Sequence, residues 1–212
     1  DYDAEFEWAY VSYQATEDLQ IRMGRIRAPF YMLSDYLEVG YAYPWLSPPR
    51  EVYSLPITSL EGADVIYSFT TGDWDQSIQV YFGAHASDVS FGGGVESELE
   101  LDSFGGVAWT IGYEDLTLRA GYHRADLTAE IADLVPLIGA LESVGLQETA
   151  DDLTTDQKEA EFLSLGVSYD PGSWFVRAEY TETEFEKQVL QDNSTWYVLG
   201  GVRMGEFTFH LT

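Results

Sequence analysis

The 212-residue sequence contains no cysteine, and its 10 lysines and arginines are outnumbered by 37 aspartates and glutamates. The lack of cysteine excludes disulfides, thiolate catalysis and cysteine-based zinc sites. The net charge of −27 argues against nucleic-acid binding, because phosphate contacts need a basic face. No apolar run approaches the roughly 20 residues of a transmembrane helix, so a helical membrane protein is excluded.

Recognisable catalytic and metal-binding motifs are also missing. The sequence has three histidines and contains neither a His-Glu-x-x-His nor a Gly-x-Ser-x-Gly motif. Its acidic clusters do not follow the spacing of a calcium-binding EF-hand loop. We therefore expect no catalytic residue, no metal site and no cofactor, and we do not expect an enzyme.

Aromatic residues are abundant for a chain of this polarity. They make up 15% of the sequence, including 15 tyrosines, 11 phenylalanines and 6 tryptophans, although the mean hydropathy is only −0.17. In a transmembrane β-barrel, residues that face lipid alternate with residues that face water, and this combination results. Composition therefore favours a membrane barrel.

Apolar and polar residues alternate over ten segments, which we expect to be β-strands. The segments are 4–14, 19–27, 63–70, 74–86, 104–113, 116–125, 160–169, 174–183, 195–204 and 207–212. The connections alternate between short ones and the long ones at 28–62, 87–103, 126–159 and 184–194. Short turns on one side and long loops on the other are typical of outer-membrane barrels.

The two faces of these strands differ in chemistry. In 104–113, for example, Val107, Trp109 and Ile111 alternate with Ala108 and Thr110. The polar face carries small and polar residues, where a soluble half-buried sheet would carry surface lysines and glutamates. Aromatic residues also lie beside the short turns, where a membrane-interface girdle belongs. We predict an all-β fold, a transmembrane antiparallel meander β-barrel, with a soluble β-protein as the alternative.

Several segments in the first third of the chain resemble Gram-negative outer-membrane porins. They are Gly24 to Tyr31, Ser34-Asp35-Tyr36, Val39-Gly40-Tyr41, Pro44-Trp45, Pro48 to Tyr53 and Gly62-Ala63-Asp64. The match is strongest over residues 4–70, and the hairpin layout extends it to the end of the chain. The resemblance implies a multi-stranded barrel, often trimeric, that passes small hydrophilic solutes.

The chain departs from this family in its length and in its last strand. It is short for such porins and ends at Leu211-Thr212 without the usual terminal aromatic residue. We therefore expect residues 1–212 to form a single porin-like domain that is incomplete at both ends. The whole barrel would then have about 16 strands, and a complete ten-stranded barrel is the alternative.

Two of the long connections have distinctive sequences. Residues 28–62 are rich in tyrosine, tryptophan and proline over Phe30–Pro56, so we expect an inserted loop that folds into the barrel and constricts it. Residues 126–159 carry apolar positions at helical spacing, interrupted by Pro136. We expect this second loop to include a short amphipathic helix that lies over the barrel rim.

The arginines give the clearest indication of a functional site. Arg22, Arg119, Arg177 and Arg203 all lie on the polar side of their strands. On a lipid-facing side each would cost about 2–4 kcal/mol near the bilayer midplane, so we expect them to line the pore. We add Arg25 and Arg27 to the expected pore-lining residues. Their strand parity is opposite to that of Arg22, and they lie near the strand end or beside a bulge.

Acidic residues of the inserted loop complete the predicted constriction. A wall of arginines facing Asp35, Glu38 and Glu51 would create a transverse electric field, which sets the selectivity of a pore. We expect a preference for anions. In the alternative interpretation the arginines pair with acids of the wall, such as Glu179, Asp64 and Glu7, and only stabilise the fold.

The sequence thus predicts an outer-membrane porin, a passive diffusion channel for small hydrophilic solutes in a bacterial outer membrane. The expected partners are outer-membrane lipid and lipopolysaccharide, small polar solutes and two further copies in a homotrimer. A substrate-specific binding barrel or adhesin is one alternative. A barrel-embedded Ser–His–acid hydrolase is the other.

Overall fold

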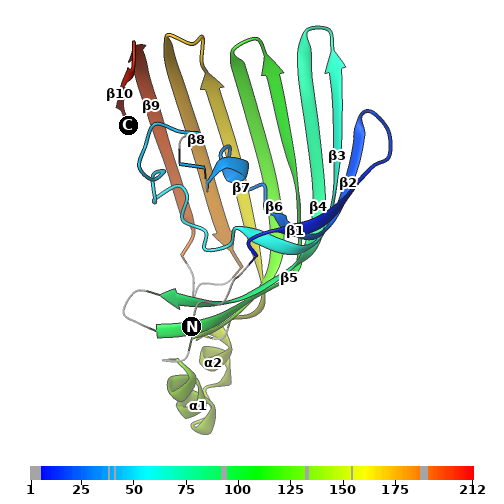
Figure 1. Cartoon of the computed structure of the whole chain (residues 1–212). Coiled ribbons are helices and arrows are strands. Elements are labelled where there is room, and N and C mark those ends of the chain that lie inside the picture. Colours follow the sequence, from blue (N-terminus) through cyan, green and yellow to red (C-terminus); the bar gives the residue numbers. More distant parts are fainter. Residues whose placement is uncertain are drawn as a thin grey trace.

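The computed structural model describes residues 6–37, 39–40, 42–91, 95–131, 134–153, 155–186 and 191–212. Ten strands form one sheet in which each strand pairs antiparallel with the next along the chain (Figure 1). The strands are β1 Ala9–Gln14, β2 Leu19–Arg27, β3 Ser59–Thr71, β4 Trp74–Phe91, β5 Val95–Tyr113, β6 Leu116–Ile131, β7 Thr155–Tyr169, β8 Trp174–Phe185, β9 Asn193–Met204 and β10 Phe207–Leu211. The predicted all-β meander is confirmed.

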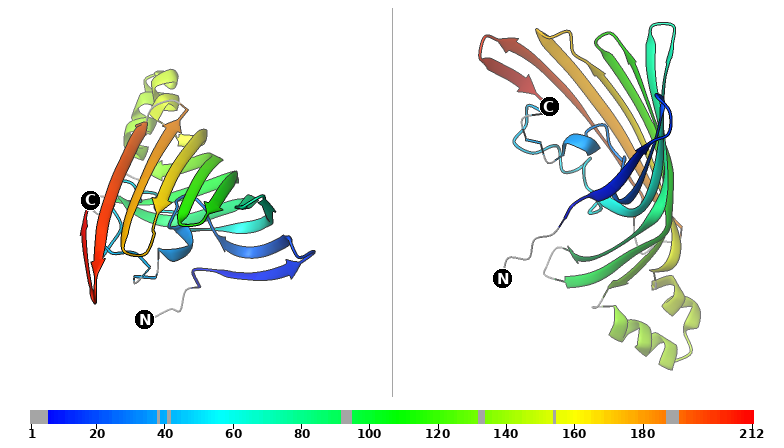
Figure 2. Two further views of the ribbon diagram at one scale, coloured as in Figure 1. Left: turned by 90° about the horizontal axis from the view of Figure 1, so that it is seen from above. Right: turned by 45° about the vertical axis from the view of Figure 1, so that its right-hand side comes forward.

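The sheet is strongly curved and remains open. β1 and β10 are its two edges, and each pairs with one neighbour only among the described strands. The curvature gives the sheet a convex face and a concave face, and the connection between β2 and β3 lies within the concave side (Figure 2). The described strands therefore do not form the closed barrel that the sequence predicted, although their topology and curvature are compatible with a barrel.

The middle strands are longer than the sequence predicted. β4 and β5 remain paired as far as Phe91 and Val95, so most of the loop expected at 87–103 is a long hairpin. The segment Val95–Leu101 carries a glutamate at every second position, and its three glutamates resemble a solvated loop. The connection expected at 126–159 is likewise shorter, because β6 continues to Ile131 and β7 begins at Thr155.

Two α-helices and one short 3-10 helix accompany the sheet. The expected helix between β6 and β7 is present as α1, Val135–Ser143, and is followed by α2, Gln147–Leu153. Neither lies over the sheet, since both project beyond the strand ends (Figure 1), and α1 has no buried residue. The 3-10 helix η1, Ser34–Tyr36, belongs to the β2–β3 connection. No helix in the described part of the chain is long and apolar enough to span a membrane.

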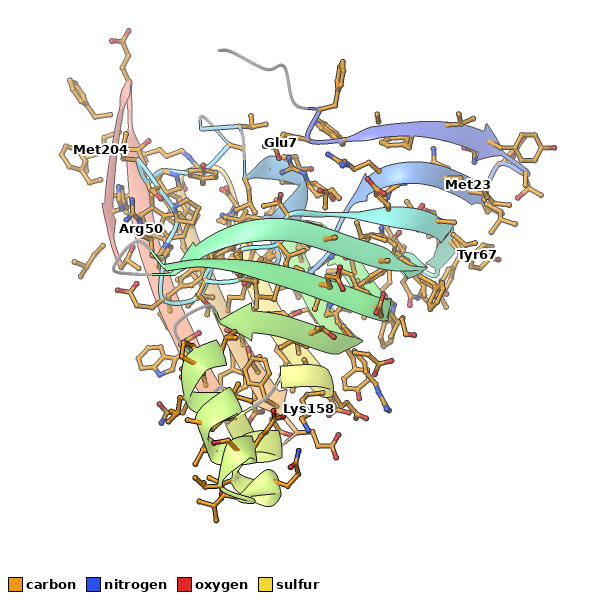
Figure 3. All side chains as sticks on the ribbon, turned by 90° about the horizontal axis from the view of Figure 1, so that it is seen from below. Glu7, Met23, Arg50, Tyr67, Lys158 and Met204 are labelled. Carbon is orange, nitrogen blue, oxygen red and sulfur yellow. The ribbon has the colours of Figure 1, made fainter. Side chains whose placement is uncertain are left out.

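Large apolar side chains cover much of the convex face without any protein to bury them. Met23, Phe82 and Trp196 are each at least 65% exposed. Met23 and Tyr67 lie at the outer margin of the curved sheet in Figure 3, away from the β2–β3 connection. The face also includes Val65, Val80, Val107, Trp109, Tyr122, Leu165, Tyr169, Trp174, Val176, Val198 and Val202. The predicted alternation of faces therefore holds over most of the sheet.

A pair of facing glycines brings β3 and β4 unusually close on the concave side. Gly62 and Gly83 are register partners, and the side chain of the fully buried Leu60 lies over both of them. A Cβ atom on Gly83 would overlap the carbonyl oxygen of Glu61 and lie 2.5 Å from Leu60 Cδ1. Glycines at such positions let a sheet bend sharply, as a barrel corner requires.

Candidate functional site

The candidate site is the concave face together with the β2–β3 connection, residues 28–58, which we name the inserted loop. Phe30 of this loop stacks on Phe104 of β5 at 5.5 Å and meets Phe162 of β7 edge-on at 5.3 Å. Farther along, Val52 is 1% exposed and packs in a cluster with Phe175 and Leu199. The loop thus supplies much of the apolar core on this side, and its role as a pore constriction stays a prediction.

Glu179 of β8 anchors the loop to the sheet. Its carboxylate accepts hydrogen bonds from the Tyr53 hydroxyl at 2.5 Å, the Met32 backbone N–H at 2.7 Å and the Tyr197 hydroxyl at 3.3 Å. Two of these three donors belong to the loop, so a buried carboxylate is fully satisfied only when the loop is in place. Burial and the neighbouring Glu179 raise the pKa of Tyr53 far above its usual value, which keeps the hydroxyl protonated as a donor.

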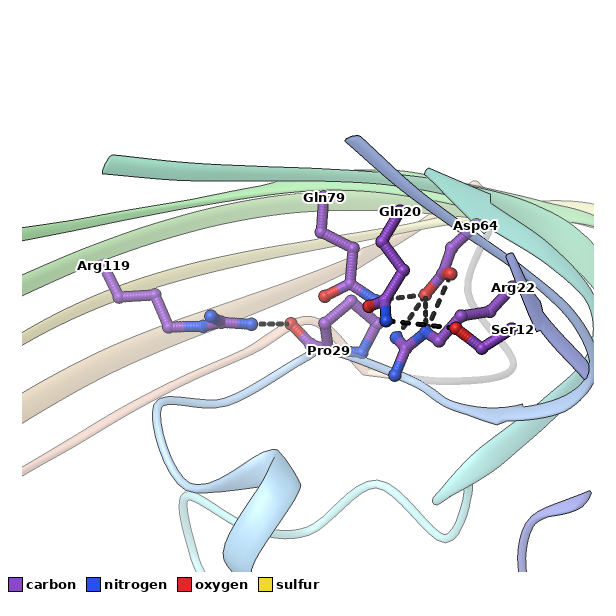
Figure 4. Close-up of polar contacts among 7 residues, drawn as sticks. All are labelled: Ser12, Gln20, Arg22, Pro29, Asp64, Gln79 and Arg119. Atoms are coloured by element: carbon purple, nitrogen blue, oxygen red, sulfur yellow. Dashed lines mark hydrogen bonds and ion pairs between the residues drawn. The ribbon is translucent and has the colours of Figure 1, made fainter. Parts of the chain in front are cut away.

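Arg119 of β6 makes a second connection to the loop. Its guanidinium donates to the Pro29 carbonyl oxygen at 2.9 Å and to Thr110 Oγ1 at 2.8 Å, and the first of these bonds is drawn in Figure 4. In the strand register Gly166 lies between Arg119 and Glu179. Met32 packs onto Gly166, whose missing side chain leaves room for it. Arg119 and Glu179 therefore flank the point where the loop meets β7.

Arg22 of β2 is bound within the wall itself. It forms a bidentate ion pair with Asp64 of the adjacent strand β3, with Nε 2.9 Å from Oδ1 (Figure 4). Gln79 of β4 donates a further hydrogen bond to Asp64 at 2.7 Å, and Asp64 is 1% exposed. For Arg22 the alternative interpretation, an arginine paired with an acid of the wall, describes the contacts.

Arg177 and Arg203 occupy different positions along the concave side. Nε of Arg177 lies 3.5 Å from Ser168 Oγ on the neighbouring strand β7. Arg203 instead binds both carboxylate oxygens of Asp170 in the β7–β8 turn, at 2.5 and 2.7 Å. This hydrogen-bonded guanidinium lowers the pKa of Asp170. Arg203 therefore belongs to the turn and not to the cluster around Arg119.

Arg25 and Arg27 also differ from each other. Arg25 pairs with Glu61 at 2.8 Å, and both side chains are partly exposed. Arg27 is 7% exposed, donates to the Ser34 carbonyl oxygen at 2.9 Å and lies over the Trp8 ring. It is the last residue of β2, so its side chain meets the start of the inserted loop.

Two of the three predicted acids of the loop, Asp35 and Glu51, do not meet the arginines directly. Asp35 and Glu51 are both exposed, and within the described residues neither lies at ion-pair distance from an arginine. Glu38 lies outside the described residues. The acid that does lie among the arginines is Glu179, which the sequence analysis named only as a possible pairing partner. Glu179 lies two residues after Arg177 on the same strand, so both side chains point to the same face. This spacing was the signal in the sequence that could have identified Glu179.

A histidine–serine neighbourhood on β6 and β7 bears on the hydrolase alternative. His123 Nδ1 is hydrogen-bonded to the Tyr81 hydroxyl at 2.8 Å, while His123 Nε2 and Ser164 Oγ have no hydrogen-bond partner among the residues that the structure describes. His123 and Ser164 are 1% and 3% exposed. The partner of the histidine is a tyrosine where a Ser–His–acid array needs a carboxylate, and neither side chain is open to a substrate. Among the described residues no group of metal-ligating side chains is gathered.

Comparison of the chain with protein-family models, with curated proteins and with solved structures gave no significant match. The likeness to porins therefore rests on the sequence pattern alone. What the structure adds is a physical arrangement: an apolar convex face, a concave face that carries both the arginines and a buried apolar core, and an inserted loop packed onto the concave face.

Proposed function

We propose that this chain forms the wall of a bacterial outer-membrane β-barrel channel through which small hydrophilic solutes diffuse. The observation that carries this proposal is the convex face, which exposes Trp109, Trp174, Trp196 and many valines. In water, monomeric proteins rarely expose a contiguous apolar patch larger than a few hundred Å². A lipid bilayer would bury this face without any further protein.

Aromatic pairs at the short turns also support a sheet that crosses the membrane with its convex face toward lipid. Trp74 packs on Tyr113 with ring centroids 4.8 Å apart, and Tyr169 packs on Trp174 at 5.3 Å. All four residues adjoin the tight β3–β4, β5–β6 or β7–β8 turns. Tyrosine and tryptophan are enriched at the level of the lipid headgroups, so this end of the sheet would lie at one membrane interface.

The open edges of the sheet require partners in a membrane. Unpaired backbone groups at a lipid-exposed edge cost several kcal/mol each, so only closed barrels are stable there. β1 and β10 would therefore pair with further strands to complete a barrel of about 16 strands. The proposed assembly in the membrane is a homotrimer in contact with lipid and lipopolysaccharide.

A preference for anions is part of the proposal. Within the described residues, Arg27, Arg119 and Arg177 have no carboxylate at ion-pair distance. None of these three forms an ion pair there, unlike Arg22 and Arg203, although the Glu179 carboxylate lies near Arg119. Many of the 37 acidic residues lie in turns and on exposed surfaces, where salt screens charges beyond about 8–10 Å. Arginines in a confined lumen are screened less.

Swelling of proteoliposomes tests the diffusion function. Vesicles that contain the protein should swell in isotonic solutions of small sugars, and the rate should fall steadily as the sugar becomes larger. Vesicles of the same lipid without protein are the control. A rate equal to that of the control for every sugar would contradict a diffusion channel.

A substrate-specific binding barrel is the second candidate, and one observation favours it. Tyr31 and Tyr53 pack with ring centroids 4.5 Å apart, and Tyr197 and Trp45 continue this row over the concave face. Tyr31 and Tyr197 are buried, so a passing solute would contact the half-buried Trp45 and Tyr53. Saturation of transport with rising solute concentration would distinguish a specific channel from free diffusion.

A further inference from the structure

A cavity of about 180 Å³ lies between the inserted loop and the concave side of β5–β8, apart from the arginines discussed above. Phe30, Leu55 and Ile57 border it from the loop. Leu101, Leu127 and Ala160 are among the strand residues that border it from the sheet. Most of the lining side chains are apolar, and the polar residues that border the cavity are His123, Arg124, Glu161 and Thr183. The cavity is partly open, and clefts lined mainly by apolar side chains are where uncharged small molecules bind in proteins.

The side chains around the cavity hold one another in place. Phe30 contacts the rings of Phe104, Phe162 and His123 at centroid distances of 5.5, 5.3 and 5.1 Å. A ring fixed on three sides cannot swing into the neighbouring space without losing those contacts. The cavity is therefore a preformed feature of the fold.

The charged residues that border the cavity already form ion pairs or hydrogen bonds with other residues. Arg124 forms an ion pair with Glu159, and Glu161 accepts a hydrogen bond from the Tyr122 hydroxyl at 2.6 Å. A charged ligand would find no counter-charge and would lose its hydration. Water is also a poor occupant, because it needs two to four polar partners. These conditions leave an uncharged apolar molecule.

We propose that this cavity is a binding site for an uncharged, apolar molecule about the size of a single aromatic ring. An engineered apolar cavity of about 150 Å³ in another protein stays dry and binds benzene, so the volume here suffices. Such a site goes beyond a channel for hydrophilic solutes. It would hold an apolar compound between the inserted loop and the concave side of the sheet.

Toluene titration of the protein in lipid nanodiscs, followed by ¹³C-methyl NMR of labelled leucines, tests the site. Leu101 and Leu127 border the cavity, whereas Leu165 is 47% exposed on the convex face. Toluene in the cavity should shift the methyl signals of Leu101 and Leu127 until they saturate. Toluene that only dissolves in the lipid should shift Leu165 in proportion to its concentration. The titration needs no conduction, so a failed channel assay leaves its result intact.

Two phenylalanine substitutions provide the matched comparison. Ala160→Phe places a ring in the cavity and should weaken the saturable shifts at least tenfold. Ala120→Phe on β6 has the opposite strand parity to the cavity-lining Ala125 and should leave the shifts unchanged. If Ala160→Phe alters the Leu165 signal without ligand, Ala125→Leu replaces it. Benzoate in place of toluene should give no saturable shift.

Three results would overturn the proposal. The first is the absence of saturable shifts at Leu101 and Leu127 in the unaltered protein. The second is saturation that survives in a correctly folded Ala160→Phe or Ala125→Leu variant. The third is benzoate binding as strong as that of toluene, because it would show that the site accepts charge.

Discussion

The Tyr53 hydroxyl of the inserted loop donates a hydrogen bond of 2.5 Å to the Glu179 carboxylate of β8. The two residues are 126 positions apart, so this bond fixes the loop to a distant strand. A buried carboxylate is stable only when its hydrogen-bond demand is met, and the loop provides much of what Glu179 needs. The position of the loop and the chemistry of the concave face are therefore coupled.

Removal of that bond should loosen the loop. Tyr53→Phe leaves the ring packing in place but deprives Glu179 of its shortest hydrogen bond, so we expect a loss of about 1–3 kcal/mol in the free energy of unfolding. Tyr36→Phe is the control, because Tyr36 lies in the same loop and is 53% exposed. Denaturant unfolding in lipid measures both variants, and equal stability of the two would show that the bond does not hold the loop.

The close approach of β3 and β4 predicts a difference between two glycines. Gly83→Ala would place a methyl group against the Glu61 carbonyl and Leu60, and overpacking of this kind costs about 1–3 kcal/mol. Gly112→Ala is the control, because the nearest atom to its added methyl is the Asp75 carbonyl oxygen at 3.9 Å. Thermal unfolding midpoints should fall clearly for the first variant only. A tolerated Gly83→Ala would mean that the sheet does not need its close contact there.

The Asp170–Arg203 pair predicts a dependence of stability on pH. The folded-state pKa of Asp170 is lowered, so its contribution is present above the unfolded pKa of about 3.9 and disappears as the pH falls through the folded value. Both side chains are more than a third exposed, and the effect should therefore be small. Asp170→Asn should be less stable than the unaltered protein at pH 7, and the two stabilities should converge as the pH falls through the lowered folded-state pKa of Asp170. Parallel stability curves over the whole range would contradict this assignment.

The two arginines without an ion pair to a described residue, Arg119 and Arg177, predict a change in ion selectivity when they are replaced. Arg119→Gln and Arg177→Gln should each move the reversal potential toward lower anion preference, because each removes a positive charge from the concave face. Arg203→Gln should change it much less, since Arg203 is already paired with Asp170 in the turn. Reversal potentials in a salt gradient measure all three variants. If none differs from the unaltered protein, these arginines serve only to stabilise the structure.

Strand order was predictable because it depends on local alternation along the chain. Segments such as Leu116–Ala125, with apolar and polar residues in strict succession, identified both the strand and its faces. The extension of β5 back to Val95 was missed because glutamates occupy its polar positions. A charged residue has the same appearance in a solvated loop as on the outer part of a strand, so polarity alone does not separate the two.

The candidate site was only partly predictable, for a different reason. Parity placed Arg22, Arg119 and Arg177 on the polar face, since successive side chains alternate across a strand. It could not reveal that Arg22 is paired with Asp64 while Arg119 binds the Pro29 carbonyl oxygen. Those contacts depend on the strand register and on the path of the inserted loop. Neither follows from a periodic pattern.

Single-channel recording in a planar lipid bilayer is the most direct measurement of the proposed function. The protein reconstituted at high dilution should produce discrete, reproducible conductance steps, with a reversal potential that indicates anion preference. Bilayers that receive Gly83→Ala protein should show fewer such steps, because the added methyl group is expected to disturb the sheet. A folded protein that associates with lipid yet yields no step above the protein-free background would contradict the channel.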